Sequence, residues 1–203
     1  MKTFLDDVNT EEVKTQVEAK ISEIIDILRL KEVVPLEHIG ETPKRIAKMY
    51  VDELFASCYS APPSMKLFTP EKGQSSGVTP VLSENIGIHS CCSHHGVPFY
   101  GKASIYYVPK NKRITGLSKF YRVCEYFGRR PQVQENLTTQ IGEYIFKELD
   151  PHQLIVVLKC EHMCVSQRGA KAHNPLTTTY WSKSDSEYPV TWDQIKFVME
   201  TIK

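Results

Sequence analysis

The sequence lacks any long hydrophobic run: none of its stretches approaches the roughly 18 consecutive apolar residues of a membrane helix. The first 30 residues also lack the basic start and apolar segment of a secretory signal, because Asp6, Asp7, Glu11 and Glu12 fall there. We therefore expect a cytoplasmic protein that does not bind or cross a membrane.

The sequence also lacks an excess of charge of one sign. Lys and Arg number 25 and Asp and Glu 24, for a formal net charge of +1. This balance gives no overall basic field of the kind that attracts nucleic acid, so no nucleic-acid partner is expected. A locally basic pocket is still compatible with this balanced net charge.

What the sequence does contain is typical of a globular protein. Its 203 residues are 41% hydrophobic and 24% charged, enough to form a buried core. The six cysteines, Cys58, Cys91, Cys92, Cys124, Cys160 and Cys164, could form three disulfides. Without a secretory signal, metal ligation or burial is the better interpretation.

The hydrophobic periodicity predicts an α+β protein rather than alternating βαβ units. We expect helices over 11–30, 42–54, 118–127 and 132–149 and a last helix that starts at a capping box at Thr191, with strands over 102–108 and 154–165. Residues 60–77, rich in Pro, Gly and Ser, read as a loop. The predicted organisation is a helical region and linking loop over 1–77, a core over 78–181 and a tail over 182–203.

Two remote segments contain potential metal ligands. Cys92 and His95 lie three residues apart, and the predicted strand 154–165 places Cys160, His162 and Cys164 on one face. Taken alone, Cys160 is better explained by core packing and His162 by an ordinary hydrogen-bonded histidine. Together the residues predict a zinc site with three protein ligands, Cys92, His95 and Cys164, which leaves a fourth position for water.

Two imidazoles are left over beside these ligands. His94 and His162 would suit proton transfer, because the ordinary pKa of histidine is near 6.5. From the residues alone, the prediction is a hydrolytic zinc site of unknown substrate.

Several cations could bind an anion. Arg45 and Lys48 share a helix face, Lys119 and Arg122 follow Ser118, and Arg168 follows Cys164 by four residues. For any single pair a solvated surface is the better interpretation. Glu135, in a first helical turn, either complements the helix dipole or accepts hydrogen bonds from the N–H groups of a guanine edge.

Five motifs together resemble the GTP cyclohydrolase I family. In chain order they are Glu41–Tyr50 (ETPKRIAKMY), Cys92–His95 (CSHH), Gly116–Lys119 (GLSK), Arg130–Glu135 (RPQVQE) and His162–Gly169 (HMCVSQRG). The resemblance covers roughly residues 10 to 180.

The resemblance implies a role for each matched residue. Zinc would be bound by Cys92, His95 and Cys164, with His94 and His162 as acid and base. Guanine would be anchored by Glu135 with its neighbour Gln134. The ribose and triphosphate would be held by Ser118, Lys119, Arg122, Arg168, Arg45 and Lys48.

The resemblance also implies a reaction, a fold and an assembly. GTP would be hydrolysed at carbon 8 of the purine while His94 protonates nitrogen 7, formate would leave, and the ribose carbons would close a new ring to give 7,8-dihydroneopterin triphosphate. This product feeds folate, biopterin or deazaguanine nucleoside synthesis. The family has the tunnelling fold, an antiparallel four-stranded sheet backed by two helices, and assembles as a homodecamer.

The sequence departs from the family pattern in three places. Ser93 replaces a usual glutamate beside the metal ligands, which removes a negative charge. Cys91 adds a second thiol next to Cys92. After Thr179 the chain continues with Tyr180-Trp181 and the predicted last helix, which would pack on its own subunit or contact a partner.

Two other functions are also compatible with the sequence. One is a ring-forming binding or regulatory protein that kept the zinc site and lost turnover, which Ser93 would favour and intact His94, His162 and Glu135 oppose. The other is a purine or pterin enzyme of the same fold with another substrate, which the predicted triphosphate cations oppose.

Overall fold

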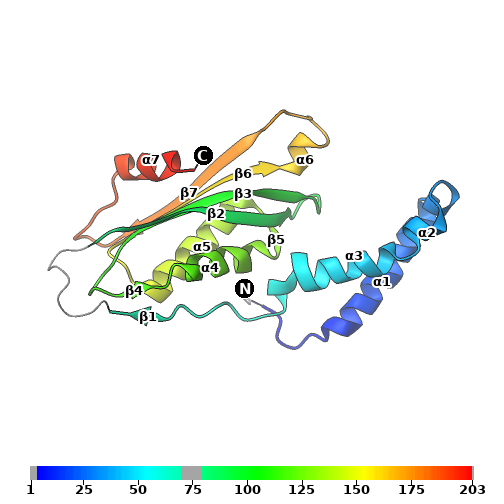
Figure 1. Ribbon diagram of the computed structural model, residues 1–203, viewed down its shortest axis with the longest axis horizontal. Coiled ribbons are helices and arrows are strands. Elements are labelled where there is room, and N and C mark those ends of the chain that lie inside the picture. The colour runs from blue at the N-terminus through cyan, green and yellow to red at the C-terminus, as the bar shows by residue number, and fades with distance from the viewer. Residues whose placement is uncertain (1–3, 70–78, 203) are drawn as a thin grey trace. The chain divides into compact units, whose positions relative to one another are not determined.

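The computed structural model describes residues 4–69 and 79–202 (Figure 1). The chain divides into two compact units, Met1–Ala61 and Pro62–Lys203. The boundary predicted at residue 77 lies outside the described residues. Among the described helices, none is long and apolar enough to cross a membrane.

The N-terminal unit is helical, as the sequence predicts. Helix α1 (Thr10–Ile27) begins where the Asn9 side chain accepts hydrogen bonds from the backbone N–H groups of Glu11 and Glu12. The second predicted helix is α3 (Thr42–Lys48), which continues as a π-helical segment, η2 (Met49–Leu54). The shorter elements of the unit are η1 (Leu30–Glu32), α2 (Leu36–Ile39) and η3 (Ala56–Cys58).

The second unit is built on a five-stranded sheet in the order β5-β2-β3-β6-β7. Its four long strands are antiparallel and comprise β2 (Val81–Cys92), β3 (Pro98–Val108), β6 (Gln153–His162) and β7 (Leu176–Ser184). The prediction of a four-stranded sheet is therefore wrong, because the sheet contains a fifth strand. The fifth, β5 (Pro131–Gln132), pairs in parallel with Cys91 and Cys92 and is too short to leave a periodic pattern in the sequence.

A second, small sheet joins β1 (Leu67–Phe68) to β4 (Ile114–Thr115). The predicted strand 102–108 is the second half of β3. Strands β2 and β7 were not predicted: a register irregularity between Ser83 and Ile86 interrupts the alternation of β2, and β7 alternates among mostly exposed side chains.

Helices cover both faces of the main sheet, as Figure 1 shows. Helices α4 (Ser118–Gly128) and α5 (Gln134–Leu149) pack on one face, over a core that includes Leu154, Val156 and Leu158 of β6. Helix α7 (Trp192–Glu200) lies on the opposite face, where Ile195 and Val198 contact Ile155 and Val157. Strand β6 is therefore buried on both sides, and its apolar run is continuous.

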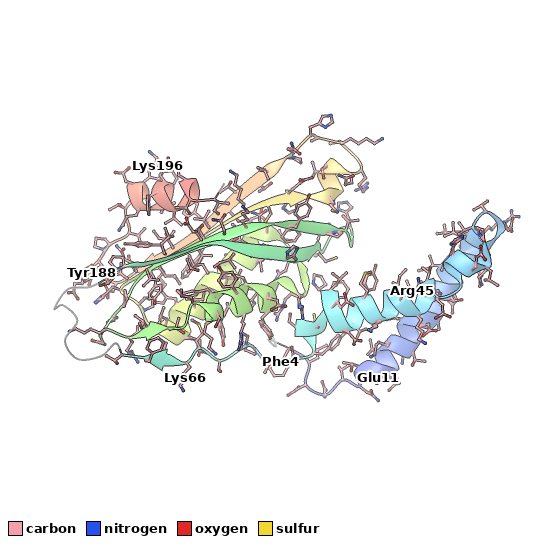
Figure 2. All side chains as sticks on the ribbon, in the orientation of Figure 1. Phe4, Glu11, Arg45, Lys66, Tyr188 and Lys196 are labelled. Carbon is pink, nitrogen blue, oxygen red and sulfur yellow. The ribbon has the colours of Figure 1, made fainter. Side chains whose placement is uncertain are left out.

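The last helix is held to the sheet of its own chain. Its predicted capping box is confirmed, with Thr191 and Gln194 exchanging side-chain and backbone hydrogen bonds. Figure 2 shows Tyr188 ahead of this helix and Lys196 on it. Packing on its own unit is thus the interpretation of the tail that the structure favours.

Candidate metal centre

The first half of the candidate site is the tight turn between β2 and β3. Cys92 is the last residue of β2, and its backbone N–H donates to Val97 O at 2.8 Å while Gly96 N–H donates to Cys92 O at 2.9 Å. Gly96 has a φ of +67°, a conformation that suits glycine. The turn projects His94 and His95 as exposed side chains beside the buried Cys92.

The second half follows β6, the neighbour of β3. The predicted strand 154–165 ends at His162, and Cys164 lies in a one-turn helix, α6 (Met163–Ser166). The prediction that Cys164 shares a strand face with Cys160 is therefore wrong. Because Phe99 of β3 pairs with His162 of β6, the sheet register brings this turn next to the Cys92–Val97 turn.

The structure brings together the three predicted zinc ligands. Cys92, His95 and Cys164 each offer one ligand atom, and these atoms lie within 4.8 Å of one another. Cys92 Sγ is 3.9 Å from His95 Nδ1. A tetrahedral zinc with these ligand types places its ligand atoms about 3.5–3.8 Å apart, so the Cys92–His95 pair fits the ion almost as it stands and the full donor set fits it after shifts of at most about 1 Å.

The electrostatics of the cluster also favour a cation. Burial, followed by the neighbouring Cys92 thiol, raises the pKa of Cys164, and the nearby Arg168 charge acts in the opposite direction. Two adjacent thiols resist losing both protons, because the two thiolates repel each other. A divalent cation between them removes this penalty.

The two spare histidines have different surroundings. His94 is exposed, and its Nδ1 lies 3.9 Å from Cys92 Sγ. The His162 ring is half-buried and stacks on Phe99, with ring centroids 4.6 Å apart and an interplanar angle of 11°. Burial lowers the pKa of His162, and the charge of Glu135 partly offsets this.

Gln134 contacts this part of the site in a way that the sequence did not reveal. It is the first residue of α5, its exposed fraction is 1%, and its Oε1 lies 2.8 Å from His162 Nε2. Its Nε2 bonds to groups on β6 and β7, including Thr179 Oγ1 at 3.0 Å. No motif signals Thr179, because the contact depends on how α5 packs on the sheet.

The remaining predicted substrate residues lie in separate elements. Glu135 is exposed in the first turn of α5, Ser118, Lys119 and Arg122 lie on the first two turns of α4, and Arg168 is exposed just after α6. Arg45 and Lys48 are exposed on α3 of the N-terminal unit, where Figure 2 labels Arg45. Their contacts with a nucleotide stay predictions.

A second group of potential ligands, His152, Asp185 and Glu187, has a different character. His152 Nδ1 lies 2.7 Å from Asp185 Oδ2, and Lys110 Nζ lies 3.6 Å from the same oxygen. Asp185 also accepts hydrogen bonds from the backbone N–H groups of Glu187 and Tyr188. These bonds fix the turn after β7 and occupy both carboxylate oxygens of Asp185 and the Nδ1 atom of His152.

Sequence comparison with known proteins finds matches that point to one enzyme family. A sequence model described as GTP cyclohydrolase I matches residues 17–191. A GTP cyclohydrolase 1 from Carboxydothermus hydrogenoformans is 44% identical over 146 residues, which cover 70% of this chain and 72% of that protein. GTP cyclohydrolase 1 from Bacillus subtilis is 40% identical, covering 82% of this chain and 84% of that protein.

One more relative and one solved structure complete the comparison. GTP cyclohydrolase 1 from Clostridioides difficile is 39% identical, covering 82% of this chain and 85% of that protein. The solved structure titled archaeosine synthase QueF-Like in the apo form aligns with a TM-score of 0.43 at 12% identity, over 55% of this chain and 98% of that one.

Proposed function

This chain belongs to the GTP cyclohydrolase I family and has that family's activity, and we propose that Cys92, His95 and Cys164 hold the zinc ion that this activity uses. The observation that supports the proposal is that two thiols and one imidazole lie within 4.8 Å of one another. They come from two turns that are distant in sequence, because His95 and Cys164 are 69 residues apart. Three protein ligands leave one position of a tetrahedral ion for water. When bound, zinc supplies Lewis acidity, which lowers the pKa of a coordinated water to about 7.

His94 and His162 are the proposed proton-transfer residues. His94 is exposed beside Cys92, where it can reach a nucleotide that enters from solvent, and we assign it the protonation of the purine at nitrogen 7. The half-buried His162 lies two residues before Cys164 on the other side of the cluster. Burial lowers the pKa of His162, which favours the neutral ring that can accept a proton at neutral pH.

Glu135 is the proposed anchor for guanine. Its carboxylate is exposed and lies close enough to His162 to influence that ring's pKa. A carboxylate has two acceptor oxygens, which match the adjacent N–H and amino donors of the guanine edge. Ser118, Lys119, Arg122, Arg168, Arg45 and Lys48 are the proposed ribose and triphosphate contacts, because phosphate oxygens require several cations.

The proposed product is 7,8-dihydroneopterin triphosphate, with formate as the second product. The proposed assembly is a homo-oligomer of the tunnelling fold, by family resemblance a decamer. The N-terminal unit supports an assembly, since Ile27, Leu28 and Val33 are each at least 60% exposed. Light scattering of the purified protein measures the mass of this assembly.

The test of function is turnover of GTP. Purified protein incubated with GTP is expected to form a product that becomes fluorescent after oxidation to the pterin. A zinc chelator and the His94→Ala variant should each abolish the signal, which separates metal-dependent turnover from contamination. A protein that binds zinc and GTP but forms no pterin would instead be a binding protein that has lost turnover.

A further inference from the structure

The hydrogen bonds of Gln134 define which way its side-chain amide faces. Its Nε2 lies 3.0 Å from Thr177 O and 3.3 Å from Leu158 O. Backbone carbonyl oxygens only accept hydrogen bonds, so the nitrogen of the amide must face them. The Oε1 atom therefore faces His162, 2.8 Å from its Nε2.

Two threonine hydroxyls extend and fix this arrangement. Gln134 Nε2 donates to Thr179 Oγ1 at 3.0 Å, and Thr179 Oγ1 lies 2.6 Å from Thr138 Oγ1. Thr138 Oγ1 in turn donates to Gln134 O at 2.8 Å. Because the Thr138 proton is used there, Thr179 must donate to Thr138, and its own oxygen is free to accept from the amide.

The orientation of the Gln134 amide determines which nitrogen of His162 carries a proton. An amide oxygen is only an acceptor, so His162 Nε2 must carry a proton and donate it to Gln134. In a neutral imidazole this leaves Nδ1 as the one nitrogen with a free lone pair. The stacked Phe99 ring restricts the orientation of the imidazole plane.

We propose that Gln134 is a positioning residue for the reaction, which with Thr179 and Thr138 fixes the orientation of the His162 ring by accepting the hydrogen bond that its Nε2–H donates. This inference rests on the proposed role of His162 as a proton-transfer residue. It also separates Gln134 from its neighbour Glu135: the Gln134 side chain is 1% exposed and faces protein groups, whereas Glu135 is exposed to solvent and available to a base.

The matched variants are Thr179→Val and Thr179→Ser. Valine has a similar shape but no hydroxyl, so the Gln134 amide loses one acceptor, while serine keeps it. We expect Thr179→Val to lower kcat about 10-fold with unchanged KM for GTP and unchanged zinc content, and Thr179→Ser to retain wild-type kcat. Gln134→Met should lower kcat more, by about 100-fold, which is the lower end of what a positioned acid or base contributes.

A readout independent of turnover is the ¹⁵N spectrum of the His162 ring, identified by its absence in a His162→Asn variant. The wild-type ring is expected to be protonated at Nε2, and the ring in Gln134→Met to be a mixture of tautomers. A wild-type ring protonated at Nδ1 would overturn the inference, as would a rise in KM with unchanged kcat in Gln134→Met, which marks a direct substrate contact. Absence of GTP turnover in the wild-type protein would instead contradict the proposed function, and the ring spectrum would still decide the tautomer.

Discussion

Phe99 and His162 lie directly opposite each other on neighbouring strands, and their rings stack with centroids 4.6 Å apart. Phe99 comes just after the turn that contains Cys92 and His95, and His162 just before the helix that contains Cys164. The pairing of these two residues therefore aligns the two parts of the candidate metal centre. A sheet slipped by one residue would turn the side chains of β6 to the opposite face and separate them.

Removing one of the two proposed ligand thiols should prevent zinc binding. Cys164→Ala leaves one thiol and one imidazole, which is too few for a stable zinc site, so we expect less than one tenth of the wild-type zinc by atomic absorption. The control is Cys91→Ala, because Cys91 is buried next to Cys92 but lies outside the ligand cluster. Full zinc content in Cys164→Ala, or its loss in a folded Cys91→Ala, would show that the ligand set is misassigned.

Replacing Glu135, the proposed guanine anchor, should affect binding rather than metal content. Glu135→Gln keeps the shape and removes a charged acceptor, whose hydrogen bonds are worth about 1.5–3 kcal/mol, so KM for GTP should rise roughly 10- to 100-fold. Zinc content should stay at the wild-type level. Glu143→Gln, an exposed change on the same helix, should leave KM unchanged. An unaltered KM in Glu135→Gln would refute the anchor.

Helix α5 approaches β7 so closely that only glycine fits at position 142. A Cβ atom there would lie 2.3 Å from the Trp181 ring, which packs against Phe146. Alanine gains about 1 kcal/mol of helix propensity, but overpacking costs about 1–3 kcal/mol, so Gly142→Ala should lower the stability measured by urea unfolding. Gly116→Ala is the control, because a Cβ atom there meets nothing within 4 Å. Equal stability of the two variants would contradict this packing.

Two buried thiols predict a loss of stability in alkali. Burial raises the pKa of Cys124 and of Cys160 to about 12, against 9.0 for the unperturbed group. Above pH 9 the unfolded chain releases these protons and the folded chain keeps them, so stability is full below pH 9 and falls as the pH rises towards 12. Each thiol contributes a slope of about 1.4 kcal/mol per pH unit at most.

The thiol contribution can be isolated by substitution. Cys124→Ala should reduce the slope of unfolding free energy against pH between 9 and 10.5, measured with urea. Val123→Ala removes a neighbouring buried side chain that cannot ionise, so it should lower stability at every pH without changing the slope. Identical slopes in wild type and Cys124→Ala would argue that the Cys124 thiol is accessible to water.

The sequence predicts the chemistry of this protein better than its sheet. Whether a side chain can bind a metal depends on its residue type and not on its secondary structure. Cys92, His95 and Cys164 could therefore be predicted as ligands even though Cys164 lies in α6 and not on the predicted strand. The helices were found because their apolar residues recur at helical spacing. Strand β2 was missed because its alternation is interrupted near Asn85, whose φ is +56°.

The partners of Gln134 could not be predicted for a different reason. Thr138 is one helical turn away, but Thr179 lies 41 residues further along the chain on β7. Their meeting depends on the close packing of α5 against β7, which Gly142 permits and no local pattern encodes. Such contacts follow from tertiary packing and become visible only in the structure.

The metal centre is tested most directly by zinc K-edge X-ray absorption on the active protein, together with the zinc content per chain. We expect one zinc per chain, with two sulfur atoms at about 2.3 Å and one histidine nitrogen and one further light atom at about 2.0–2.1 Å. Full GTP turnover by protein that contains no metal, or a zinc ion without sulfur ligands, would contradict it.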